Sequence, residues 1–165
     1  MTRVNVAERL LIAPRVQERG PDLQLYVIFT DLPATNLALE AANQLAHDLD
    51  ARVTVLVAQV VPYPLAPECP PVSVRFTEQV LSRLVRDREL ETTVHVYLCR
   101  DRDETIRQAL LPESIVVVGS RKRWWRKAEK ALARVLRRDG HHVILFDTTR
   151  FHELEAALAV AESNR

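Results

Sequence analysis

The densest group of chemically active side chains in the sequence is the run RKRWWRK, residues 121 to 127. Guanidinium and ammonium groups at the beginning of a helix could hold a nucleotide or another small phosphate ligand. The same cations could instead contact nucleic-acid phosphates while the two indoles stack on bases, or they could dock an acidic protein. The remaining interpretation is a solvated helix face, with one tryptophan in the core and the other at a subunit contact.

Charge is distributed unevenly along the chain, although its net value is only +1. Residues 121 to 138 contain nine Lys or Arg and a single acid, Glu129, which gives +8 there and leaves −7 for the rest. Such polarity creates a local positive field, but the acidic remainder would repel nucleic acid, and the basic helix has no recognition-motif partner. We therefore expect an acidic protein or a small phosphate ligand as partner and regard nucleic acid as disfavoured.

No other residues form a recognisable catalytic or metal-binding pattern. The sequence has no GxSxG motif and no paired carboxylates beside a base, and His141-His142 lack a third ligand at suitable spacing. Cys69 and Cys99 have no CxxC spacing, so we expect Cys99 to be a buried thiol on a strand. The sequence thus predicts no catalytic residue and no metal site, and an enzyme is the least favoured class.

The elements that must position these residues alternate between strand-like and helix-like patterns. Near-continuous apolar runs predict strands at residues 23–30, 52–61, 93–99, 114–120 and 142–147. Helical stripes lie between them, and we expect Thr35 to cap the first helix and Asp103 the third. Asp31, after the first strand, could serve equally as a ligand contact or as a turn and cap residue. This alternation predicts an open five-stranded parallel sheet with helices on both faces. Ligands of such sheets bind beyond the carboxyl ends of the strands.

The two ends of the chain lie outside this repeating unit. We expect an N-terminal extension at residues 1–20, the α/β domain at 21–148 and a C-terminal helix at 149–165. The first residues lack the apolar core and cleavage site of a leader, and no run approaches the roughly 18 apolar residues of a membrane span, which predicts a cytoplasmic protein. The apolar fifth strand would form an unpaired sheet edge, which predicts a homodimer.

Three segments occur in a recognisable order: IFTDLPATNLALEAANQLAHDLDARVTVLVAQVVP, then SIVVVGSR, then HVILFD. Over residues 23–147 the chain resembles the universal stress protein family. The resemblance implies a five-stranded parallel sheet that is commonly dimeric through its last strand, and a role in the stress response. In the ATP-binding branch of the family, an Asp after the first strand, a Val ending the second and a glycine-rich stretch after the fourth hold the nucleotide. Asp31, Val60 and Gly119 match the Asp, the Val and the first glycine.

The rest of that glycine-rich stretch is missing. Lys122 stands where the second glycine would be, and the later Gly-Ser pair of the family falls near Glu129 and Lys130. Phosphate loops use glycine because the backbone must approach the oxygens closely, often at positive φ. The resemblance therefore implies the family's fold with a degenerate ATP site.

The leading functional hypothesis is a non-catalytic, universal-stress-like regulatory or interaction protein that dimerises and does not bind ATP in the family's manner. Its interaction patch would comprise Trp124, Trp125, Arg126, Lys127 and Lys130. The alternative is a sensor of a nucleotide or other phosphate ligand, held by Asp31, Val60, Gly119, Ser120, Arg121, Lys122 and Arg123. An enzyme of unknown reaction is the third hypothesis.

Overall fold

The computed structural model describes residues 23–66, 68–86, 92–120 and 125–147. The expected N-terminal extension at 1–20 and the expected C-terminal helix at 149–165 lie outside the described residues, and so do residues 121 to 124 of the basic run. The predicted strands and the helices between them lie within the described residues.

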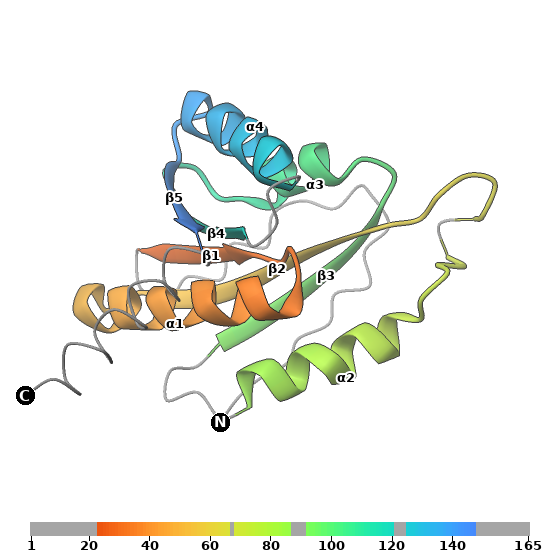
Figure 1. The fold of residues 1–165 in the computed structure, drawn as a ribbon, viewed down its shortest axis with the longest axis horizontal. Coiled ribbons are helices and arrows are strands. Elements are labelled where there is room, and N and C mark those ends of the chain that lie inside the picture. The colour runs from red at the N-terminus through yellow and green to blue at the C-terminus, as the bar shows by residue number, and fades with distance from the viewer. Residues whose placement is uncertain (1–22, 67, 87–91, 121–124, 148–165) are drawn as a thin grey trace, which may run out of the picture.

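Five strands and four helices alternate along the described chain, as the sequence predicts (Figure 1). They are β1 (Gln24–Ile28), α1 (Leu32–Leu49), β2 (Arg52–Val60), α2 (Val74–Val85), β3 (Thr92–Cys99), α3 (Arg102–Ala109), β4 (Ile115–Ser120), α4 (Trp125–Arg138) and β5 (His142–Asp147). All neighbouring strands are parallel, and their order in the sheet is β3-β2-β1-β4-β5. The predicted fold class is confirmed, and each strand begins and ends within two residues of its predicted range.

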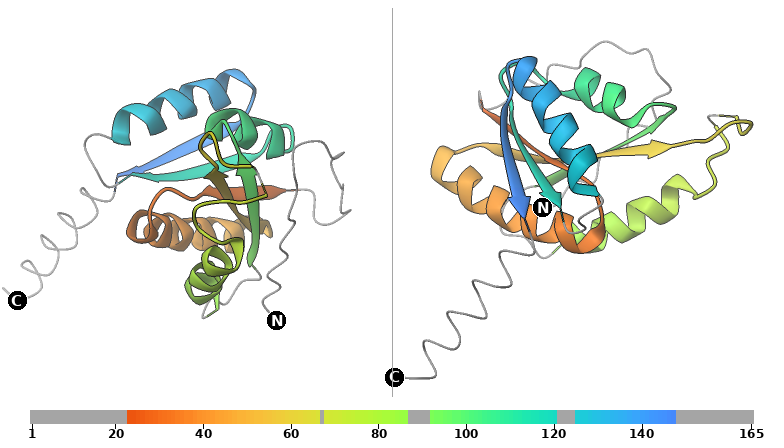
Figure 2. Two further views of the ribbon diagram at one scale, coloured as in Figure 1. Left: turned by 90° about the vertical axis from the view of Figure 1, so that its right-hand side faces the viewer. Right: turned by 45° about the horizontal axis from the view of Figure 1, so that its top comes forward.

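The helices form one layer on each face of the sheet, with α1 and α2 on one side and α3 and α4 on the other (Figures 1 and 2). Successive side chains of a strand point to opposite faces, so each central strand contributes to both cores. In β1, Leu25 and Val27 pack toward α1 and α2, whereas Tyr26 and Ile28 pack toward α3 and α4. Burial on both faces explains why these strands read as continuous apolar runs.

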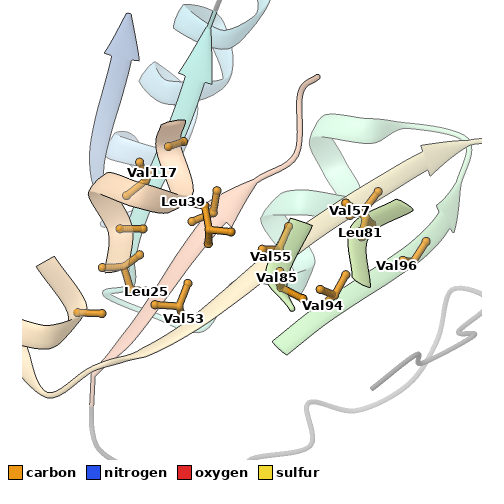
Figure 3. Close-up of a cluster of buried hydrophobic side chains, with 14 residues drawn as sticks. Leu25, Leu39, Val53, Val55, Val57, Leu81, Val85, Val94, Val96 and Val117 are labelled. Atoms are coloured by element: carbon orange, nitrogen blue, oxygen red, sulfur yellow. The ribbon is translucent and has the colours of Figure 1, made fainter. Parts of the chain in front are cut away.

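The core beneath α1 and α2 combines small and branched side chains (Figure 3). Helix α1 contributes mainly alanines, Ala38, Ala42 and Ala46, which allow its axis to lie close to the sheet. Helix α2 contributes two fully buried residues, Leu81 and Val85, which pack over the valines of β2 and β3. The close approach of α1 has a direct consequence for the residues at the end of β4.

Neither Thr35 nor Asp103 caps its helix in the structure, so these two predictions are wrong. Asp31, not Thr35, caps α1: its Oδ1 accepts a hydrogen bond from the backbone N–H of Ala34 at 2.8 Å. Asp101, not Asp103, caps α3 through the N–H of Glu104 at 2.9 Å. A capping residue has extended backbone just before the first helical turn. The connections from β1 to α1 and from β3 to α3 are short, so Asp31 and Asp101 already occupy that position.

Candidate functional site

The carboxyl ends of the strands meet at one edge of the sheet, and chain direction reverses there between two neighbours. The chain runs outward from β1 to β3 on one side and from β4 to β5 on the other, so β1 and β4 flank the switch point. In open parallel sheets this is where ligands bind. Asp31 follows β1, and Gly119 and Ser120 end β4, so the structure brings these three predicted residues to the switch point.

The end of β1 is tied to its surroundings by short polar contacts. Thr30 donates its hydroxyl hydrogen to the carbonyl of Gly119 at 2.9 Å, and its N–H donates to the buried hydroxyl of Thr35 at 3.2 Å. Asp31, which is half-buried, uses one carboxylate oxygen to cap α1. The aspartate therefore has a structural task at the switch point that is independent of any ligand.

Gly119 is required by packing. A Cβ atom at this position would lie 2.3 Å from the carbonyl oxygen of Ala34 and 3.2 Å from the Cβ of Ala38. The first of these atoms belongs to the α1 backbone, which cannot move aside as a flexible side chain can. The glycine that matches the family's phosphate loop is thus needed for α1 to pack against β4.

Val60 lies farther out along the same edge. In the register of β1 with β2, Ile28 faces Leu56, so β2 continues for four residues beyond the end of β1. The side chain of Val60 is 43% exposed there. Ser120, by contrast, is buried at the end of β4.

The proline-rich loop after β2 is held by Arg100. Its guanidinium donates to the carbonyl oxygens of Val61 and Leu65, both at 2.6 Å, and lies 4.1 Å from the ring centroid of Tyr63. Tyr63 is 81% exposed, so the guanidinium covers one face of an otherwise solvated ring. Close to Arg100 in sequence, Arg102 and Asp103 form a partly exposed ion pair at 3.3 Å.

Glu129 enters the predictions from the sequence only as the single acid of the basic segment and as a position where the family has its later Gly-Ser pair, and a buried role is not predicted for it. Its side chain is fully buried, and neither carboxylate oxygen has a hydrogen-bond partner among the described residues. Burial raises the pKa of this carboxyl, and the nearby charges of Asp103 and Asp31 act in the same direction, opposed by Arg102. The pKa of Glu129 thus responds to the charges of Asp31, which follows β1, and Asp103, on α3.

A sequence signal for the burial of Glu129 exists. Together with the buried Leu132, Ala133 and Leu136 it follows the i, i+3, i+4, i+7 spacing of one helix face. A search for apolar periodicity alone does not include an acid on the same face, which is why this signal is easily missed.

The predicted basic residues are only partly placed. Arg121, Lys122, Arg123 and Trp124 lie outside the described residues, and nothing is described of the side chains of Trp125 and Arg126. Lys127 and Lys130 are exposed on α4.

Other titratable groups lie away from this edge or within the core. Cys99 is buried, and burial raises the pKa of its thiol, so its prediction as a buried strand thiol is confirmed. His141 is buried at the opposite end of β5, where burial lowers the pKa of its imidazole. In the described part of the chain, no group of three His, Cys, Asp or Glu residues could hold a metal ion.

A separate search for membrane spans covers the same described ranges. None of the helices found there is long and apolar enough to cross a bilayer.

Fold and site together define the class: an open, doubly wound α/β domain with five parallel strands whose order reverses between β1 and β4. This is the fold that the resemblance to universal stress proteins implies. No protein-family model matches the chain, and no curated protein matches it. Among solved structures, the chain is similar to a protein from the universal stress protein family of Burkholderia pseudomallei.

That similarity is 21% in sequence identity, covers 74% of this chain and 94% of the other, and has a TM-score of 0.49. Values this low assign no activity or ligand. The functional conclusion must therefore come from the residues of the chain itself.

Proposed function

We propose that the chain is a non-catalytic, universal-stress-like regulatory protein that acts through interactions with other proteins and does not hold ATP in the family's manner. The observation that carries the proposal is the buried carboxyl of Glu129 close to Asp31 and Asp103. A nucleoside triphosphate at the switch point would bring several negative charges toward the carboxyl groups of Asp31 and Asp103, and the carboxyl of Glu129 offers it no positive charge.

Two further features support the same conclusion. The backbone N–H cradle of a phosphate loop depends on glycines, and the chain has Lys122 and Glu129 where the family pattern calls for small residues. The one glycine that does match, Gly119, is already required by its contact with the α1 backbone. Its presence is therefore no sign of a phosphate site.

We propose that the protein works as a homodimer through the free edge of β5. In this strand, the N–H of His142 donates to the carbonyl of Ser114 at 3.0 Å, so the backbone groups of Val143 and Leu145 point away from β4. Ile144 is 41% exposed beside them. An open edge of this kind can pair with the same strand of a second copy about a two-fold axis.

The second candidate is a small-molecule sensor in the cytoplasm, and the orphaned carboxyl of Glu129 is the observation that favours it. A buried carboxyl without a described partner can accept hydrogen bonds from a ligand that enters the switch point. The ligand would then carry donor or cationic groups, in contrast to the phosphate ligand expected from the basic run.

Thermal unfolding with and without excess Mg-ATP tests the proposal. A ligand at about 100 times its dissociation constant stabilises by about 2.7 kcal/mol, which raises Tm by several degrees in a domain of this size. We expect no rise. The matched variant is Asp31→Ser, which keeps a capping hydroxyl for α1 but removes the carboxylate. A rise in the unaltered protein that disappears in Asp31→Ser would refute the proposal and favour nucleotide sensing.

A further inference from the structure

The outer face of α4 is a continuous row of cations. Five exposed side chains form it, and they are called the basic face below: Lys127, Lys130, Arg134, Arg137 and Arg138. The residues turned inward on the same helix are apolar except for Glu129, so the only acid of α4 is withdrawn from the surface. From the first cation to the last, the face spans about 16 Å at the rise of an α-helix.

The described acids around α4 do not neutralise this face. Asp139, just after the helix, is engaged by Arg107 of α3 through contacts of 2.7 and 3.3 Å. Arg137 donates to the carbonyl of Val143 at 2.8 Å, which leaves its charge uncompensated. Within the described ranges, no ion pair involves any member of the basic face.

The width of the basic face favours a narrow partner. The adjacent helix α3 carries Asp103 and Glu104, both partly exposed, and the chain outside residues 121 to 138 has a net charge of −7. A nucleic-acid duplex is wider than one helix, so its phosphates would also meet these acids. The described side chains of the face include no aromatic ring on which a base could stack.

The pattern of the face matches that of another helix. Its cations recur at intervals of three and four residues, the spacing at which carboxylates align along one side of an α-helix. A small exposed residue, Ala131, lies next to Lys127 and Arg138 on the same side of the helix, and the exposed Ala128 lies farther round, so a second helix can come close along that side. Charge and shape thus agree on the same kind of partner.

We propose that the basic face of α4 docks an acidic α-helix of a partner protein. The proposal rests on the interaction role proposed above and gives it a surface and a partner class. The proposed surface is separate from the switch point, because the basic face is exposed while Glu129 is buried in the core.

The test uses the full chain and a labelled helical peptide with Glu at every third or fourth position. Binding is followed by fluorescence anisotropy at low salt and at about 0.15 M salt. The comparison ligands are the same peptide with Gln in place of Glu, and single-stranded and duplex DNA. The reversal variant carries Arg134→Glu and Arg138→Glu. The matched control carries Arg75→Glu and Arg83→Glu, two exposed positions of α2 on the opposite face of the sheet.

We expect the Glu peptide to bind and the Gln peptide not to bind. The reversal variant should lose at least about tenfold in affinity, because two positions of the basic face then repel the peptide, while the control changes little. Equal losses in both variants would show bulk charge attraction and overturn the proposal. Tighter binding of DNA through the same arginines would overturn it in favour of nucleic acid, and no binding of the Glu peptide would overturn it outright.

This result and the nucleotide test can fail separately. Stabilisation by Mg-ATP together with peptide docking would remove only the claim about ATP. Loss of peptide docking without any response to Mg-ATP would remove only the basic face of α4 as the interaction surface.

Discussion

Single residues at the switch point combine structural duties with the positions that a ligand would use. Asp31 caps α1, Gly119 leaves room for the α1 backbone, and the buried carboxyl of Glu129 has no hydrogen-bond partner among the described residues. The resemblance matched Asp31 and Gly119 to the family's ATP-binding pattern, because the first comes soon after the first apolar run and the second lies near the end of the fourth. It could not reveal that packing alone accounts for the glycine, because the clash involves Ala34, a residue 85 positions away in sequence.

Glu129 should make stability depend on pH in a direction unusual for an acid. Its pKa is raised in the folded state above the ordinary value of 4.5, so the folded protein holds the proton more tightly than the unfolded chain does. This group's contribution to the free energy of unfolding therefore falls as pH rises from that value through the raised pKa. Glu129→Gln should remove the fall.

Urea unfolding at a series of pH values between about 4.5 and 8 measures this effect. We expect the gain of Glu129→Gln over the unaltered protein to be larger at the upper end of the series. The exposed Glu68→Gln serves as control and should follow the unaltered protein at every pH. A gain for Glu129→Gln that does not change with pH would contradict the burial of an ionisable carboxyl.

Gly119→Ala should destabilise the fold in the absence of any ligand. The added methyl group would overlap the carbonyl of Ala34 at 2.3 Å, and relieving that overlap requires α1 to shift, at a cost of about 1–3 kcal/mol. Chemical denaturation of the purified variant measures the loss. Unchanged stability would show that Gly119 is not needed for packing and would restore a ligand-binding explanation.

Among the elements, the strands were predictable and the helix starts were not. Strands buried on both faces leave a continuous apolar record in the sequence, and all five were found within two residues. The position of a cap depends on where the helix begins after a strand. Here the helices begin after Asp31 and Asp101, which is earlier than caps at Thr35 and Asp103 would require. The order of the strands cannot be read from apolar runs, because it depends on contacts between distant segments.

The correction at α3 can be tested by a pair of substitutions. Asp101→Ala removes the hydrogen bond to the N–H of Glu104 and should lower the free energy of unfolding by about 0.5–2 kcal/mol. Asp103→Ala removes only a partly exposed ion pair with Arg102 and should cost less than about 1 kcal/mol. Denaturant titration of both variants decides between them. A larger loss for Asp103→Ala would reinstate the cap predicted from the sequence.

At the scale of the whole molecule, the basic face of α4 and the edge strand β5 lie on the same side. Helix α4 presents the basic face, and β5 beside it is the outermost strand (Figure 2). Arg137 joins the two by its hydrogen bond to the carbonyl oxygen of Val143, which covers part of the edge. The sequence indicated both the basic segment and the edge strand, but their contact follows only from the folded chain.

Sedimentation equilibrium of the full chain, with and without Mg-ATP, tests the central claim of an ATP-independent interaction protein most directly. We expect twice the monomer mass in both conditions. Ile144→Lys, which places a charge on the free edge of β5, should shift the protein to monomer, whereas the exposed Leu49→Lys on α1 should not. A monomer at high micromolar concentration, or a dimer that forms only when Mg-ATP is present, would contradict the account.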